Sequence, residues 1–303
     1  MRTTLVIWLC LATFACGPGP KPTGDDDGTT DAPPAQGDGN EERCTSIDVL
    51  FVIDNSGSME QEQTNLIANF PTFISVLNNS GLDYRVAVTT TGRNYTWKQQ
   101  TPFGTVTESQ DGGDNGTMLQ PASCNMQQRW ITKSDPDPTA EFSCVANVGI
   151  GGPGDAEMPL GAVRDAFEER VADGTNAGFH RSDALLGIVM LTDEEDCSYE
   201  QSITLGTFES LCESKQEPVA NYVQFLDTFT GNRTRWATAV IAGLGPGQCS
   251  SAFGNADEAT RLKDFVQQTG PNAAQSSICD GDLSIGLMKA LMVFDSACGG
   301  VIF

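Results

Sequence analysis

Three side chains with the chemistry of cation ligands follow the first strongly apolar segment of the chain. Asp54, Ser56 and Ser58 stand directly after residues 47–53, and their alternate spacing lets one carboxylate and two hydroxyls converge from a single turn. Asp193 follows a second apolar segment much later in the sequence. Carboxylate and hydroxyl oxygens are the ligands that Mg²⁺, Mn²⁺ and Ca²⁺ prefer. The sequence therefore predicts a divalent-cation site with one coordination position left for a carboxylate from a partner.

The segments before these side chains are expected to be buried strands of one sheet. Residues 47–53 and 184–191 are nearly continuous apolar runs, as in parallel strands buried on both faces, and residues 84–90 and 236–242 predict two more strands. Apolar residues at helical spacing predict helices around residues 66–77, 160–167, 219–226, 259–266 and 283–291. Pro71 predicts a kink or break in the first helix. This alternation favours a doubly wound, mostly parallel α/β sheet flanked by helices, in which ligands bind beyond the carboxyl ends of the strands.

At these residues the chain resembles the von Willebrand factor type A (VWA) family. The segment DVLFVIDNSGSM is similar to the family's first strand and metal-ion-dependent adhesion site, and IVMLTDEED is similar to a later strand with its Asp. The resemblance covers roughly residues 45–295 in the order of elements. It implies that Asp54, Ser56 and Ser58 approach a metal ion and that Asp193 binds it directly or through a neighbouring ligand. It also implies a Rossmann-like sheet and a binding role.

The remaining ligand of that family is a Thr in a glycine-containing loop before a helix, and here the chain departs from the pattern. Aligning residues 162–163 with the family's Ala-Leu places Glu157 at the Thr position, with Asp155 as the nearby alternative. A Glu adds charge and reach, so we expect Glu157 to act as a built-in ligand. The open alternative is that the motif persists as a scaffold turn without metal.

The cysteines predict a disulfide framework. Of ten cysteines, Cys10 and Cys16 belong to the N-terminal segment, and none of the other eight forms a CxxC pair, so zinc-site spacing is absent. The eight candidates suit an oxidising compartment; they are Cys44, Cys124, Cys144, Cys197, Cys212, Cys249, Cys279 and Cys298. Pairs 124–144, 197–212 and 249–279 are local, and 44–298 would join the ends, although many other pairings are possible. Residues 92–150 are interpreted as an insertion with at least a short strand and a disulfide.

The N-terminus predicts export. Residues 1–15 combine an early Arg with a short apolar run, which is typical of a signal peptide and too short to span a bilayer. The following Cys16 resembles the lipidated cysteine of a bacterial lipoprotein; the alternative is ordinary signal cleavage that leaves Cys16 as a thiol or disulfide partner. Residues 16–43 are rich in Gly, Pro and Asp and predict a flexible stalk. Residues 44–303 then form the VWA-like domain.

The net charge and the absence of certain motifs exclude several classes of function. A formal net charge of −23 argues against nucleic-acid binding and against docking on anionic lipid. The single His180 and the absence of GxSxG and HExxH argue against catalysis. We therefore expect a non-enzymatic protein that binds a protein or glycan ligand through its metal face. Its expected place is the outer membrane or cell surface rather than the inner membrane, held by the lipid anchor alone. The alternative is a structural envelope component that uses the fold as a scaffold.

Overall fold

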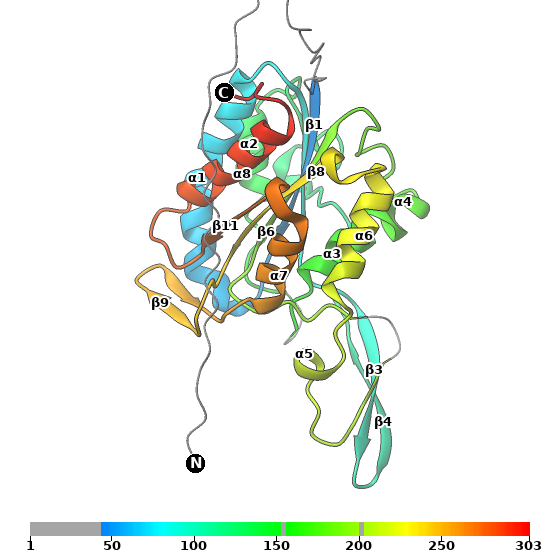
Figure 1. Ribbon diagram of the computed structural model, residues 1–303. Helices are drawn as coiled ribbons and strands as arrows, with labels where there is room; N and C mark the ends of the chain where they lie inside the picture. The colour runs from blue at the N-terminus through cyan, green and yellow to red at the C-terminus, as the bar shows by residue number, and fades with distance from the viewer. Residues whose placement is uncertain (1–43, 153–155, 200–202) are drawn as a thin grey trace, which may run out of the picture. The chain divides into compact units, whose positions relative to one another are not determined.

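A six-stranded sheet forms the centre of the protein (Figure 1). The computed structural model describes residues 44–152, 156–199 and 203–303. The strand order is β11 (Ala273–Ser277), β8 (Trp236–Ala242), β6 (Leu185–Leu191), β1 (Ser46–Ile53), β2 (Asp83–Thr90) and β5 (Ile131–Thr132). All neighbours are parallel except β5, which is antiparallel to β2. The predicted α/β class with a mostly parallel central sheet is confirmed.

Apolar side chains on β1 point alternately into two cores, which explains its continuous apolar sequence. Val49 and Phe51 belong to the core on one face of the sheet, whereas Leu50 and Val52 belong to the core on the other. Successive side chains of a strand point to opposite faces, so a strand covered on both sides needs apolar residues at every position. The four strands predicted from such runs are β1, β2, β6 and β8.

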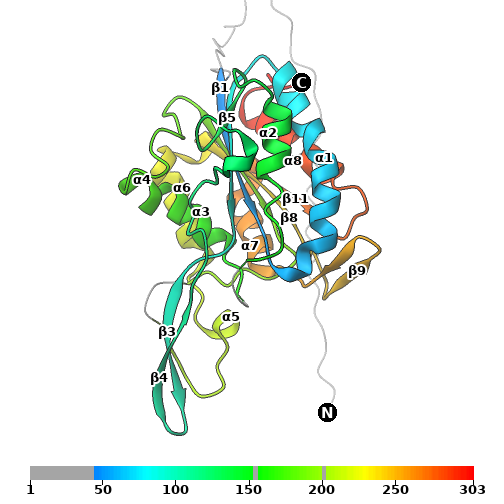
Figure 2. The same ribbon diagram turned by 180° about the vertical axis from the view of Figure 1, so that it is seen from behind.

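Helices cover both faces of this sheet (Figures 1 and 2). One face packs against α1 (Glu60–Asn79), α2 (Pro138–Val145) and α8 (Ser284–Ala297). The other packs against α3 (Pro159–Phe167), α6 (Val219–Thr230) and α7 (Thr260–Thr269), with α4 (Glu169–Ala172) after α3. Pro71 does not break α1, which runs unbroken over twenty residues. Pro71 lies on the exposed side of the helix, away from the core.

Two small sheets lie outside the central one. β3 (Tyr95–Thr101) and β4 (Gly104–Gln110) form a hairpin, and β7 (Thr204–Leu205) pairs with the other edge of β3. β9 (Cys249–Ser251) and β10 (Gly254–Ala256) form the second. Both views show the β3–β4 hairpin projecting from the end of the central sheet at which β1 finishes (Figures 1 and 2). The insertion predicted at about residues 92–150 thus contains strands and a helix.

Four disulfides connect the eight predicted cysteines, and all four proposed pairs are confirmed. They are Cys44–Cys298, Cys124–Cys144, Cys197–Cys212 and Cys249–Cys279. The first joins Cys44, two residues before β1, to Cys298, the residue after α8, with Cα atoms 4.8 Å apart. The second holds the insertion, and α5 (Leu211–Ser214) carries one end of the third.

Several predictions from the sequence lie outside the described residues. They are the signal peptide of residues 1–15, Cys16 with the stalk of residues 16–43, and Asp155. Among the helices of the described part, none is both long enough and apolar enough to cross a bilayer.

The disulfide between the chain ends should contribute more stability than the local ones. Cys44–Cys298 closes a loop of sequence separation 254, against 20 for Cys124–Cys144. Loop-closure entropy predicts a loss of about 5 kcal/mol in the free energy of unfolding for Cys44→Ser/Cys298→Ser and about 3 kcal/mol for Cys124→Ser/Cys144→Ser. Urea unfolding of the two double variants, with the other disulfides oxidised, measures both. Equal losses would contradict an effect governed by loop size.

Candidate metal centre

Asp54 is placed by the pairing of β1 with β6. Ile53 lies opposite Leu191, so Asp54 and Thr192 leave the sheet side by side at its carboxyl edge. The Asp54 carboxylate is fully buried and accepts hydrogen bonds from the Ser56 amide at 2.7 Å and the Thr192 hydroxyl at 2.6 Å. A carboxylate oxygen can accept more than one hydrogen bond. These two contacts therefore orient the Asp54 carboxylate and leave lone pairs that could bind a cation.

The two serines connect the turn after β1 with the loop after β6. The hydroxyls of Ser56 and Ser58 lie 2.8 Å apart, and the Ser58 hydroxyl donates to Asp193 at 3.2 Å. The Asp193 carbonyl in turn accepts from the Asp257 amide at 2.8 Å, which fixes the loop from its other side. Four of the five residues predicted from the sequence therefore meet at one edge of the sheet.

Glu157, the residue that departs from the family pattern, lies in the segment before α3. Its carboxylate is buried and accepts a hydrogen bond from the Thr91 hydroxyl at the end of β2. The backbone on both sides is fixed, because Met158 N donates to Thr91 O at 3.2 Å and Cys197 N donates to Glu157 O at 2.8 Å. Glu157 interacts electrostatically with Asp54 and Asp193, so it belongs to the same cluster of charges.

Burial makes these carboxyl groups hard to ionise. Burial raises the pKa of Asp54, and it raises the pKa of Asp193 to about 7, with the charge of Asp54 adding to the effect. The pKa of Glu157 rises to about 9 for the same two reasons, burial first and Asp54 second. The ion pairs found among the described residues include none of the three. A carboxyl group whose pKa is raised in this way ionises more easily when a cation lies beside it.

A fourth acid in this region was not predicted. Glu62, in the first turns of α1, is fully buried, and neither carboxylate oxygen makes a hydrogen bond of standard length and angle. Gly254 of β10 packs directly against it, so that even a Cβ there would overlap the carboxylate. Burial raises the pKa of Glu62. The signal was present in the sequence, because Glu62 stands four residues before Leu66 in the apolar stripe of α1.

The loop after β6 also fixes the start of α3. Asp196 accepts from the Leu160 amide at 3.1 Å, and Ser198 accepts from the Gly161 amide at 2.8 Å. Arg261 completes the buried contact, with its Nε 3.0 Å from Asp196. These bonds satisfy amides that a helix start leaves free, and they connect the Asp193 loop to the helix that follows Glu157. The sequence analysis assigned no role to Asp196.

The donor set suits a hard divalent cation, with hydroxyls as essential members. Within the described residues, no group of three or more His, Cys, Asp or Glu side chains is arranged to hold a metal ion. Asp54, Ser56 and Ser58 with Asp193 provide mixed carboxylate and hydroxyl oxygens, which Mg²⁺, Mn²⁺ and Ca²⁺ accept.

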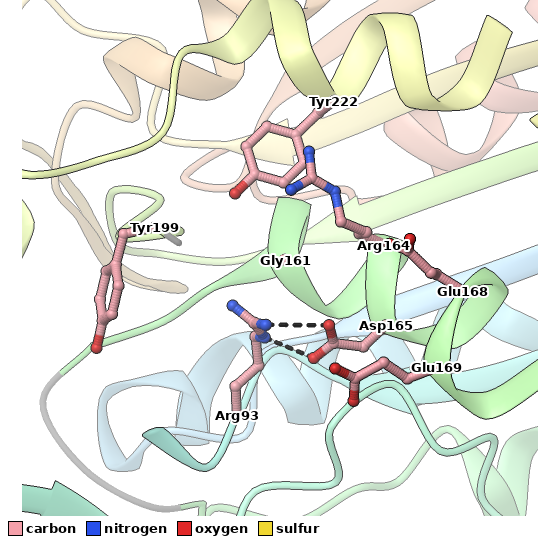
Figure 3. A pocket seen from close by; sticks show the side chains of 8 residues that line it. All are labelled: Arg93, Gly161, Arg164, Asp165, Glu168, Glu169, Tyr199 and Tyr222. Atoms are coloured by element: carbon pink, nitrogen blue, oxygen red, sulfur yellow. Dashed lines mark hydrogen bonds and ion pairs between the residues drawn. The ribbon is translucent and has the colours of Figure 1, made fainter. Parts of the chain in front are cut away.

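A separate cavity of about 290 Å³ lies beside α3 (Figure 3). It is lined by Arg93, Gly161, Arg164, Asp165, Glu168, Glu169, Tyr199 and Tyr222. Two of its arginines are paired with carboxylates: Arg93 binds Asp165 through two bonds, and Arg164 binds Glu217, just before α6, at 2.6 Å. Arg93 lies directly against Gly161, where a side chain would displace it.

Comparisons with known proteins leave the family open. No protein-family model matches the chain, and no curated protein matches it. Among solved structures, the pilus adhesin SpaC from Lactobacillus rhamnosus GG is similar at 9% identity and a TM-score of 0.43, over 83% of this chain and 31% of that one. Proximal thread matrix protein 1 from the mussel byssus is similar at 10% identity and a TM-score of 0.43, over 84% of this chain and 49% of that one. The chain spans less than half of either protein, and likenesses below a TM-score of 0.5 carry no argument about function.

The raised pKa values predict how stability depends on pH without metal. In EDTA, we expect the free energy of unfolding to fall as pH rises from about 4 to about 9. The folded protein keeps protons on Asp193 and Glu157 that the unfolded chain releases near pH 4, so the folded state binds more protons across this window. Urea unfolding at stepped pH measures the profile. Glu157→Gln should flatten its upper part, and excess Mg²⁺ should restore stability at high pH. A flat profile in EDTA would contradict the assignment.

Proposed function

We propose that this protein is a VWA-like module that binds a divalent cation and, through it, a protein or glycan partner, without catalysis of its own. The observation that carries the proposal is the meeting of Asp54, Ser56 and Ser58 with Asp193 at the carboxyl edge of β1 and β6. This edge is where ligands bind in open α/β sheets. The similarity of DVLFVIDNSGSM and IVMLTDEED to VWA motifs supports the same assignment.

The donor set leaves room for a partner's oxygen. Asp54, Ser56 and Ser58 supply one charge and two neutral hydroxyls, fewer donors than the six or more oxygens that these cations take. Water or a partner's carboxylate or hydroxyl would complete the coordination. Such a contact would give metal-dependent adhesion, in which EDTA releases the partner.

The second candidate is a structural component whose metal site only stabilises the fold. The buried position of Glu157 favours it, because a third negative charge beside Asp54 and Asp193 repels an incoming carboxylate. Pull-down from envelope extract with and without EDTA separates the two candidates. Asp54→Ala serves as the metal-site control, since it removes the carboxylate at the centre of the cluster. A partner that stays bound in EDTA and binds Asp54→Ala equally well would contradict the adhesive role.

Glu157→Thr should distinguish a built-in ligand from a neighbouring charge. Replacing the carboxylate by a hydroxyl removes negative charge, so the affinity for Mg²⁺, Mn²⁺ and Ca²⁺ should fall, while carboxylate-dependent partner binding should rise. Asp54→Ala should abolish both. Titration calorimetry with each cation measures the affinities. Unchanged metal affinity in Glu157→Thr would exclude Glu157 as a ligand and transfer that role to Asp155 or water.

We further propose that the protein is exported and tethered through Cys16. Four disulfides support an oxidising compartment. The mature protein should partition into detergent, and Cys16→Ser should release it or leave it uncleaved, because the lipid would be its only membrane contact. Phase partition and intact-mass measurement test this. A mature, unmodified N-terminus at another residue would contradict the anchor.

A further inference from the structure

The β3–β4 hairpin exposes an unusual combination of groups. Every residue of β4 from Gly104 to Ser109 is exposed, and Phe103 in the connecting turn is 101% exposed. β3 is paired with β4 on one side and with the two-residue β7 on the other, so β4 forms the long outer edge of this small sheet. A seven-residue free edge with an aromatic tip is a feature that proteins ordinarily cover or interrupt.

The free edge of β4 lacks the usual protective devices. Its sequence, GTVTESQ, contains no Pro and no Lys, and Thr and Val favour strands. Thr101 pairs with Gly104 across a two-residue turn, so in hairpin geometry Gly104, Val106 and Glu108 bond to β3. Thr105, Thr107 and Ser109 therefore direct their backbone N–H and C=O groups outward. The N–H and C=O groups of another extended backbone can form hydrogen bonds with such a row.

The charge of the hairpin and of the whole chain distinguishes between the possible binding partners of the β4 edge. Residues 95–110 carry one Lys and one Glu, so the hairpin is neutral on a chain whose net charge is −23. A second copy would bring another −23 toward the first, which disfavours self-pairing, and anionic lipid is disfavoured for the same reason. An uncharged extended segment of a different protein can pair with this edge without bringing a further charge out of water.

We propose that β4 is a docking edge for an extended, uncharged segment of a partner protein, which adds to the small sheet as a fourth strand. Backbone hydrogen bonds to Thr105, Thr107 and Ser109 would hold the segment, and Phe103 would cover its apolar side chains. The hairpin projects from the end of the central sheet at which β1 finishes (Figure 1), and Asp54 of the candidate metal centre directly follows β1. Docking at the edge does not need the metal, so it stands independently of the proposed adhesion site.

Hydrogen exchange with a defined peptide tests strand addition. The full chain is incubated with acetyl-Thr-Val-Thr-Ser-Thr-Val-Thr-amide, and exchange is followed in fragments covering residues 104–110, with residues 46–53 as internal reference. Exchange in 104–110 should slow about tenfold when the peptide is at about ten times its dissociation constant, in EDTA as in Mg²⁺. The same peptide with every amide N-methylated should give no protection.

Two variants of one residue give a matched control. Thr107→Pro removes an outward N–H and is compatible with an edge strand, so it should lose the protection, whereas Thr107→Ser should keep it. Exchange in residues 95–101 reports whether the hairpin stays folded, and the methylated peptide tests the wild-type chain directly. The proposal is overturned if the methylated peptide protects residues 104–110 equally well. It is also overturned if the wild-type chain forms a dimer that Thr107→Pro dissociates. A third contrary result is binding of the chain to phosphatidylcholine vesicles through Phe103 with no protection by the peptide.

Discussion

The register between β1 and β6 is the constraint on which the rest of the site depends. Because Ile53 lies opposite Leu191, Asp54 and Thr192 leave neighbouring strands at the same height, and their side chains bond at 2.6 Å. A shift of one residue would turn every apolar side chain of β1 to the wrong core. The packing that buries both faces of the sheet thereby also fixes the carboxylate. Fold stability and site geometry rest on the same pairing.

Burying several carboxyl groups at one edge of the sheet is unfavourable when they are ionised. Asp54, Glu157 and Glu62 are buried: Asp54 accepts a hydrogen bond at each carboxylate oxygen, Glu157 accepts one from Thr91, and Glu62 accepts none of standard length and angle. Buried charge without compensation is strongly unfavourable, so such groups either retain protons or gather a cation. Hydroxyls from Thr91 and Thr192 orient two of the acids without adding charge. This arrangement makes the protonation of the edge sensitive to pH.

The sequence was informative where one local signal decided the outcome. The apolar runs of β1 and β6 and the DNSGS turn predicted both the sheet and four of its clustered side chains. β11 was missed because AAQSS has no apolar run: at the edge of the sheet it is covered less completely. Glu62 was missed although it stands at helical spacing from Leu66, because a carboxylate in an apolar stripe is normally exposed and its burial here also involves Gly254, far away in sequence. Whether Glu157 or Asp155 replaces the family's Thr depends on loop geometry, which no spacing rule determines.

The disulfide between Cys44 and Cys298 has a mechanical consequence. Tension applied through the chain that precedes Cys44 would reach a sulfur bridge before it reaches β1, and a backbone hydrogen bond from Cys44 to Cys298 at 3.2 Å reinforces that point. The load is then shared with α8, which packs across β8 and β11. The covalent link prevents tension at this end from separating β1 from its neighbouring strands one residue at a time. A tether at this end could transmit force while the opposite edge keeps its geometry.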